Sequence, residues 1–336
     1  MSLASPGPTP VPPAVARAAA PRTRIQRREL HGVLLLDKPL GLSSNQALQR
    51  VKYLLRAQKA GHTGTLDPLA TGLLPLCFGA ATKFSHAALE ADKTYVATLR
   101  LGVSTDSGDA EGRVLQQRAV QFTDTQLEAA RQALCGEIWQ TPPMHSALKH
   151  EGRALYEYAR EGVEVAREPR RVTIHRLDIL RRDDAGMDIE VCCSKGTYVR
   201  TLAHDLGERL GCGAHLTALR RTASGGLRVD QAVTLEALQA MSEAERERTL
   251  LPPDHLMSAW PAVELGAEDA GRFLSGVRRR GPWAAAPAVR VYGPATDAAP
   301  GAQPAFLGSA HVIGGELIPT RLLSPLEVQG LAAQRF

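Results

Sequence analysis

A single carboxylate, Asp67, lies within a stretch of sequence that can hold it in a fixed direction. This stretch, Gly61 to Cys77, contains three glycines and two prolines. It predicts a loop followed by a short apolar segment over 73–78, with neither a helix nor a central strand through it. Pro68 restricts the preceding Asp67 to an extended backbone. An ionised group held there against apolar residues can act as a nucleophile, although an isolated Asp-Pro pair also begins many ordinary turns.

A second chemically active side chain, Arg200, is predicted to lie in the first turn of a helix. Apolar and polar residues alternate over 187–193, as in a strand with one buried face, and the strand breaks at Gly196. Apolar residues then recur at helical spacing up to Gly211, a typical C-terminal stop. A cation is unfavourable near the positive end of a helix dipole. We therefore expect Arg200 to have an anionic partner.

The elements that must position these residues follow from the spacing of the apolar residues. Residues 32–38 form an apolar run that predicts a buried strand. Ser43 and Gln46 stand at capping-box spacing and predict the start of the next helix. The other predicted elements are strands over 93–102, near 172–180 and over 187–193, and a helix over 126–134. Because cleanly alternating strands are typical of antiparallel sheets, we predict a mixed α/β (α+β) fold with a largely antiparallel sheet flanked by helices.

The segment 139–171 has the composition of an RNA-binding surface. Its basic residues are interleaved with two tyrosines: Lys149, His150, Arg153, Arg160, Arg167, Arg170 and Arg171 with Tyr156 and Tyr158. Basic groups contact phosphates, and aromatic rings stack on unpaired bases. Five glutamates in the same segment weaken its positive field. A solvated charged face is therefore an alternative explanation for part of the pattern.

The overall charge is weaker support for a nucleic-acid partner. The chain has 336 residues and a net charge of +5, but residues 1–28 hold five arginines and no acid, which leaves 35 basic and 35 acidic residues in the remainder. We predict that these 28 residues are a disordered, proline- and alanine-rich tail. It either adds non-specific RNA affinity or has no role.

Composition also narrows the class of protein. No apolar run approaches the roughly 18 residues that a membrane helix needs. The five cysteines have no metal-ligand spacing, which indicates structural thiols in a reduced, cytoplasmic protein. The histidines form no ligand motif either, so we expect no metal.

The character of the sequence changes after Asp254. Residues 283–304 are rich in alanine, proline and glycine, and residues 306–323 predict a hairpin that turns at Gly314-Gly315. We therefore place a main domain at 29–256 and a small β-rich domain at 257–336. Arg278, Arg279 and Arg280 are either a phosphate contact of this small domain or part of a solvated loop.

The stretch from Gly61 to Cys77 resembles the signature loop of the TruB family of tRNA pseudouridine synthases. Members of this family isomerise uridine 55 in the T-arm of tRNA. The resemblance implies that Asp67 is the catalytic aspartate and that His62 lies beside the flipped nucleotide. Tyr95 resembles the tyrosine that stacks on the target uracil, and it is also a candidate proton acceptor.

Other motifs between about 31 and 250 match the same family. The run 194–200 resembles the motif whose arginine, here Arg200, pairs with the catalytic aspartate, which would depress the pKa of Asp67 by roughly one to three units. Beside His62, the substrate-binding residues implied by the resemblance are Tyr198 and Leu219 in the base pocket, Lys38 with Pro39 under the signature loop, and Lys149 in a thumb loop. Arg220 and Arg221 are phosphate contacts or exposed. In the thumb loop, His145 stands where many members carry tyrosine.

These motifs imply a monomeric, cytoplasmic enzyme that flips a uridine of tRNA, cleaves its N-glycosidic bond and rejoins the base through carbon. The resemblance implies no metal or cofactor, no membrane and no protein partner, and it makes residues 257–336 a PUA-like module. Two alternatives stay open. A nucleoside hydrolase would normally need a second carboxylate about 5–10 Å from the first. A non-catalytic RNA-binding protein or tRNA chaperone would share the segment 139–171, but it gives no reason for an Asp67–Arg200 pair.

Overall fold

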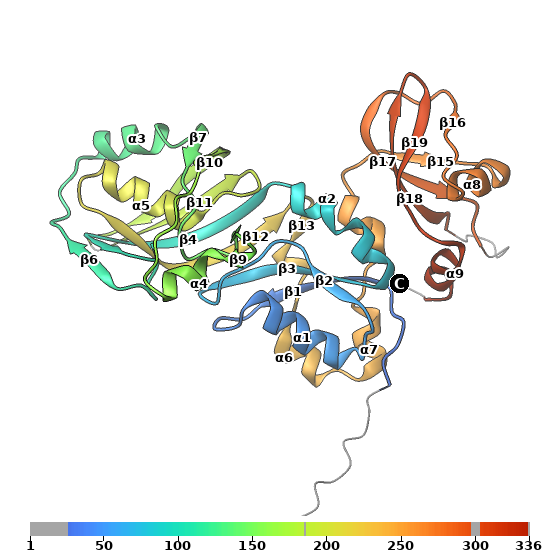
Figure 1. The fold of residues 1–336 in the computed structure, drawn as a ribbon, viewed down its shortest axis with the longest axis horizontal. Helices are drawn as coiled ribbons and strands as arrows, with labels where there is room; N and C mark the ends of the chain where they lie inside the picture. Colours follow the sequence, from blue (N-terminus) through green and yellow to red (C-terminus); the bar gives the residue numbers. More distant parts are fainter. Residues whose placement is uncertain (1–25, 185, 297–302, 335–336) are drawn as a thin grey trace, which may run out of the picture.

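The computed structural model describes residues 26–184, 186–296 and 303–334. They form a large sheet with helices packed on it and a smaller sheet to one side (Figure 1). The predicted mixed α/β fold is confirmed. No helix within these ranges is long and apolar enough to cross a membrane.

The large sheet has the strand order β14-β1-β3-β12-β4-β11-β10-β7, with β2 paired to β3 and β13 paired to β12. Its neighbouring strands are antiparallel except in two pairs, β1 with β14 and β3 with β12. The strands are β1 (Gly32–Lys38), β2 (Ala60–His62), β3 (Ala70–Phe78), β4 (Lys93–Leu101), β7 (Gly136–Gln140), β10 (Arg170–Arg182), β11 (Gly186–Cys193), β12 (Ala214–Ser224), β13 (Leu227–Arg228) and β14 (Val233–Thr234). The largely antiparallel sheet agrees with the alternating sequence patterns.

Helices cover the two ends of this sheet (Figure 1). One apolar cluster joins α1 (Ser44–Leu54) and α6 (Leu235–Ala240) to β1 and β3. A second joins α3 (Asp124–Gln132) and α5 (Val199–Arg209) to β4, β11 and β12. The predicted cap is confirmed, because the Ser43 hydroxyl accepts from the Gln46 backbone N–H and the Gln46 side chain accepts in return from the Ser43 N–H. The remaining elements of this part are α2 (Ser85–Glu90), α4 (Leu155–Arg160), α7 (Glu243–Arg248), the ribbons β5 (Val103–Thr105) with β6 (Val114–Gln117) and β8 (Lys149–His150) with β9 (Arg153–Ala154), and the 3-10 helices Gly79–Phe84, Val229–Gln231 and Pro253–Met257.

Strand β3 is a central strand, and the prediction that excluded one from this stretch is wrong. It lies between β1 and β12, with Pro75 in its middle. The Pro75 carbonyl accepts from the Thr63 N–H, so this edge of residue 75 faces away from β1. On that side β12 pairs with residues 70–72 and β2 with residues 76–78. The missing N–H of the proline falls in the opening between these two partners, so no ladder bond is lost.

The smaller sheet has the order β15-β17-β18-β19-β16. Its strands are β15 (Ala262–Glu264), β16 (Arg279–Arg280), β17 (Ala286–Gly293), β18 (Ala305–Ile313) and β19 (Glu316–Leu322), accompanied by α8 (Ala267–Leu274) and α9 (Pro325–Ala333). The predicted hairpin is confirmed, because β18 and β19 pair antiparallel and turn at Gly314-Gly315. Each arginine of Arg278–Arg280 pairs with an acid, Glu316 or Asp269, within this part of the chain.

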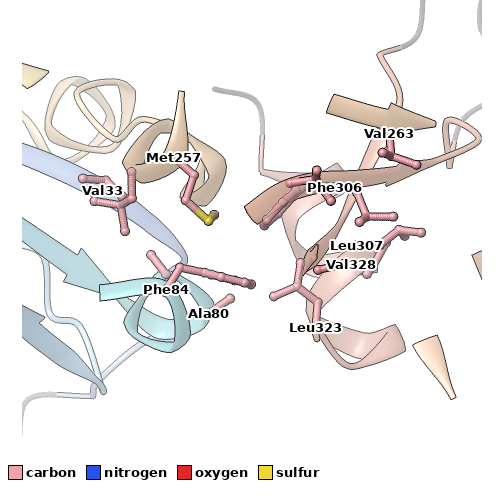
Figure 2. Close-up of a cluster of buried hydrophobic side chains, with 14 of the residues drawn as sticks. Val33, Ala80, Phe84, Met257, Val263, Phe306, Leu307, Leu323 and Val328 are labelled. Atoms are coloured by element: carbon pink, nitrogen blue, oxygen red, sulfur yellow. The ribbon is translucent and has the colours of Figure 1, made fainter. Parts of the chain in front are cut away.

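The two sheets share one apolar cluster (Figure 2). It runs from Val33 of β1 through Phe84 and Met257 to Phe306 of the small sheet. The rings of Phe84 and Phe306 meet edge to face at 5.1 Å between centroids. An ion pair at 2.6 Å between the Lys83 ammonium and the Glu327 carboxylate lies beside this cluster. Apolar packing therefore fixes the small sheet against the large one.

The predicted tail is residues 1–28, of which residues 1–25 lie outside the described part of the chain. Its last residue belongs to the folded part. The Arg28 N–H donates to the Arg56 carbonyl, and the Arg28 guanidinium pairs with Glu243 and Glu247 at 3.0 and 2.6 Å.

Substitution of Gly72 tests how closely β3 and β12 approach. Gly72 has a φ of +96°, and a Cβ added there would lie 2.3 Å from the Arg221 carbonyl oxygen. Gly72→Ala is therefore expected to lower the free energy of unfolding by more than about 2 kcal/mol in urea denaturation. Gly61→Ala is the matched control, because its Cβ would meet nothing within 4 Å, and its effect should stay within about 0.5 kcal/mol. Equal stability of the two variants would contradict this packing.

Candidate active site

Asp67 and Arg200 meet although 133 positions of sequence separate them. Asp67 lies in the loop between β2 and β3, and Arg200 lies in the first turn of α5. The Arg200 Nη2 and the Asp67 Oδ2 are 2.9 Å apart. The Asp67 side chain is 43% exposed, whereas that of Arg200 is only 6% exposed. The anionic partner expected for Arg200 is therefore present, and the carboxylate remains open to a ligand.

Arg200 has a second carboxylate partner, Asp109. The Arg200 Nη1 lies 3.4 Å from the Asp109 Oδ2, and the Asp109 side chain is 5% exposed. The Ser107 hydroxyl donates to Asp109 at 2.6 Å, and Arg200 also donates to the carbonyl oxygens of Ser107 and His145. The carboxylate of Asp109 is therefore buried and hydrogen-bonded. Of the two acids that pair with Arg200, Asp67 is the more exposed one, which a substrate can reach. The conflict between Arg200 and its helix dipole was the one sequence signal for such an arrangement.

A cavity of about 360 Å³ opens beside Asp67 and Arg200. Its walls include Tyr95 of β4, Tyr198 at the N-terminus of α5, and Leu219 of β12. The Tyr198 N–H donates to the Gln140 side chain at 3.0 Å, which fixes the start of the helix. Burial raises the pKa of both tyrosines, so both are neutral phenols at neutral pH. The structure thus gathers the predicted catalytic pair and three predicted pocket residues around one space.

A larger adjoining cavity, of about 950 Å³, shares Asp67 and Arg200 with the first. His62 lines this second cavity and not the first. The pKa of His62 is lowered by burial and, to a smaller extent, by the charge of Arg221, so the imidazole is neutral at neutral pH. Its Nδ1 is buried and has no hydrogen-bond partner within the described part of the chain. A ligand bound across both cavities would meet His62 beside Asp67.

The loop that carries Asp67 is fixed from below. The Ser44 hydroxyl accepts from the Leu66 N–H at 2.7 Å and donates to the Leu66 carbonyl at 3.0 Å. The Gly41 N–H donates to the Pro68 carbonyl at 2.9 Å. The start of α1 and the turn before it therefore hold both neighbours of Asp67, and this rigid support suits a catalytic group.

Lys38 lies beneath this loop, as the family motif implies, and its part in substrate binding stays a prediction. Its side chain has no exposed surface, and its ammonium donates to the Pro39 and Leu42 carbonyls at 2.9 and 2.6 Å. Burial lowers the pKa of Lys38 to about 8, an effect that the charge of Asp67 opposes. Lys38 supports the turn under the loop and lines neither cavity.

The two adjacent arginines of β12 have separate environments. Arg220 forms a two-bond contact with Asp37 at 3.0 and 2.7 Å and does not line either cavity. Arg221 is 1% exposed, so the prediction that it is a phosphate contact or an exposed residue is wrong. It lines the smaller cavity beneath the loop.

The segment 139–171 borders the larger cavity. Tyr156 and Arg160 line it, and the Arg160 guanidinium lies over the Tyr156 ring at 5.1 Å. Arg153 covers the Tyr158 ring in the same way at 4.5 Å. Lys149 is exposed on β8 and lines neither cavity, so its role in substrate binding stays a prediction.

Comparison with known proteins identifies the family. Residues 52–199 match the family model described as TruB family pseudouridylate synthase (N terminal domain), and residues 200–258 match the tRNA pseudouridylate synthase B C-terminal domain. The chain is 56% identical to a protein named tRNA pseudouridine synthase B from Verminephrobacter eiseniae, over 94% of this chain and 96% of that protein. It is 60% identical to the protein of the same name from Ralstonia nicotianae, over 88% and 95% of the two chains. The chain belongs to the TruB family of pseudouridylate synthases.

Solved structures share the fold. A chain of a Cbf5–Nop10–Gar1 complex superposes with a TM-score of 0.66 at 23% identity, covering 90% of this chain and 87% of the other. A chain of an H/ACA RNP bound to a substrate RNA containing 2'-deoxyuridine gives a TM-score of 0.65 at 21% identity, covering 90% and 87%. The resemblance to these chains concerns the fold alone.

Removal of the Arg200 charge should destabilise the protein more than removal of a half-exposed arginine. Arg200→Met leaves the buried Asp109 carboxylate without its cation, and we expect a loss of about 3–5 kcal/mol in the free energy of unfolding. Arg220→Met breaks the more exposed pair with Asp37 and should cost no more than about 1 kcal/mol. Urea denaturation of both variants measures the difference.

A double variant tests whether the unpaired Asp109 carboxylate causes the loss of stability in Arg200→Met. Asp109→Asn combined with Arg200→Met removes both charges, so it should recover part of the stability that Arg200→Met loses. A double variant that is less stable than Arg200→Met would argue against an unpaired buried carboxylate.

Proposed function

We propose that this protein converts uridine 55 in the T-arm of tRNA into pseudouridine. The observation that carries the proposal is the ion pair of Asp67 with Arg200 at a cavity lined by Tyr95, Tyr198 and Leu219. The choice of tRNA as the substrate rests on two findings. The chain belongs to the TruB family, and relatives that are 55–60% identical are named tRNA pseudouridine synthase B. The position within tRNA follows from the resemblance of the signature loop.

The reaction is an isomerisation, so one glycosidic bond is exchanged for another without net gain or loss of atoms. The N1–C1′ bond of uridine breaks, the uracil turns, and a C5–C1′ bond forms. The proton at C5 leaves, and N1 ends with a proton. Asp67 serves as the nucleophile, since its oxygens are accessible and its charge is balanced by Arg200.

The target base must leave its stack before it can reach Asp67, at a cost of a few kcal/mol. Stacking on one aromatic ring returns roughly 1–3 kcal/mol, which Tyr95 can supply from the wall of the cavity. Leu219 adds an apolar surface, and Tyr198 closes the side next to Arg200. His62, neutral in the adjoining cavity, is placed to contact the neighbouring nucleotide.

The rest of the tRNA must be held by surfaces outside these cavities. The segment 139–171, with Lys149, Tyr156 and Arg160, borders the larger cavity and is the first such surface. Residues 257–336, as a PUA-like domain after a catalytic domain at 29–256, would be a second. A cytoplasmic location fits a protein that acts on tRNA, and a monomer suffices because one chain supplies every proposed residue.

Two other activities predict different products. A nucleoside hydrolase would release free uracil, but the second carboxylate here, Asp109, is buried and bonded to Arg200 and Ser107. A non-catalytic RNA-binding protein would bind tRNA without changing it. Such a protein gives no reason for the ion pair of Asp67 with Arg200.

Tritium release tests the proposal directly. A tRNA transcript labelled with tritium at C5 of uridine should release one tritium per molecule with the wild-type protein and none with Asp67→Asn. Because Asp67 is 43% exposed, its replacement should leave tRNA affinity within about threefold. Filter binding measures this affinity.

A transcript with cytidine at position 55 is the control for the site and should release no tritium from the T-arm. Free uracil among the products would instead favour the hydrolase. Tight binding of tRNA without any tritium release by the wild type would overturn the synthase and favour the RNA-binding protein.

A further inference from the structure

Arg221 occupies an opening inside the large sheet. Along β3, the residues 73–75 have no strand partner on one side, because β12 pairs only with 70–72 and β2 only with 76–78. The Arg221 side chain fills this opening, and its Nε donates to the Leu73 carbonyl at 2.7 Å. A guanidinium thus replaces a strand as the hydrogen-bond partner of β3.

Among the described residues, this buried guanidinium has no carboxylate partner. Within the described residues no Asp or Glu oxygen lies within 4.0 Å of it, in contrast to Arg200 with its two acids. Burial is the main cause of the lowered pKa of Lys38, Lys93 and His62, and the nearby charge of Arg221 lowers each of them further. A buried charge without a counter-charge is costly, and an apolar side chain could fill the same space. Its presence therefore indicates a task beyond packing.

The contacts of Arg221 show what that task is. Its Nη2 donates to the Gly64 carbonyl at 3.1 Å, three residues before Asp67. Gly64 has a φ of +79°, and a Cβ added there would lie 3.1 Å from the Arg221 Nη1. On the other side, Arg221 pairs with Tyr95 across β12 and β4. Both residues line the smaller cavity, where burial raises the pKa of the Tyr95 phenol and the charge of Arg221 opposes that effect.

We propose that Arg221 is a positioning residue for the reaction. By bonding to the Gly64 carbonyl next to Tyr95, its partner across β12 and β4, the guanidinium fixes the loop of Asp67 relative to the stacking tyrosine. The two groups then meet the uracil at a set separation from different walls of one cavity. This inference rests on the proposed function, because it gives Asp67 and Tyr95 their parts in the reaction.

The role has a kinetic signature. Arg221 is 1% exposed, so it makes little contact with the body of the tRNA. Its replacement should therefore slow the chemical step and leave tRNA affinity nearly unchanged. Misplacement of reacting groups by about 1 Å costs roughly 10²-fold in rate.

The experiment measures single-turnover tritium release and tRNA binding for Arg221→Lys, Arg221→Met and the neighbouring control Arg220→Met. Arg221→Lys keeps the charge but loses the fork that reaches two partners. We expect both Arg221 variants to be slower by about 10²-fold, with tRNA affinity within about threefold of wild type. Arg220→Met should release tritium at a rate close to that of wild type.

A double-mutant cycle with Tyr95→Phe separates positioning from support of the fold. Tyr95→Phe keeps the ring and removes the phenol oxygen on which the charge of Arg221 acts. If Arg221 acts through that oxygen, Arg221→Lys should slow the Tyr95→Phe protein at least tenfold less than it slows the wild type. Three results would each overturn the proposal. Arg221→Lys could slow both backgrounds equally, it could react at the wild-type rate, or the Arg221 variants could lose both their fold and tRNA binding.

The wild type and Arg220→Met distinguish this failure from a failure of the proposed function. Tritium release by both, together with additive effects in the cycle, would remove only the role of Arg221. The absence of release from wild type would remove the proposed function and this inference with it.

Discussion

Arg200 is a buried cation that pairs with two acids, Asp67 and Asp109. The geometry of the whole site depends on this residue. Arg200 is drawn into the first turn of α5, against its dipole, because Asp109 and two backbone carbonyls surround it there. Burial of this arginine removes water from one side of Asp67 while leaving the other side open. The site therefore has a fixed charge distribution before any substrate arrives, which is the condition under which electrostatic stabilisation is most effective.

The sheet supplies rigidity at the point where its own hydrogen bonding is interrupted. Pro75 and the opening beside it leave β3 with unpaired backbone groups, and the Arg221 side chain and the Thr63 N–H satisfy two of them. The loop of Asp67 leaves the sheet directly next to this interruption. The interruption in β3 is thus tolerated because hydrogen bonds from Arg221 and Thr63 replace those of a neighbouring strand.

Much of the fold could be predicted because its signals are local. The cap at Ser43, the alternation along β4 and β11, and the turn at Gly314-Gly315 each follow from neighbouring residues. The resemblance of the run 194–200 to a family motif also predicted that Arg200 meets Asp67. What the sequence does not reveal are the features set by distant packing.

The errors share that origin. Pro75 argues against a central strand unless the change of partner from β12 to β2 is known. Arg221 and Lys38 look exposed by residue type, because a buried cation is recognised only from the carbonyls that receive it. Asp109 was passed over since its partner, Arg200, lies 91 positions away.

The joint between the two sheets bears on how the chain acquires its structure as it is synthesised. Strand β1 is made early, yet His31 just before it exchanges hydrogen bonds with Gln334, 303 positions further along the chain. That pairing cannot form until translation has passed residue 334. Such long separations between contacting residues slow folding, so the backbone of His31 gains its partner only after α9 has left the ribosome.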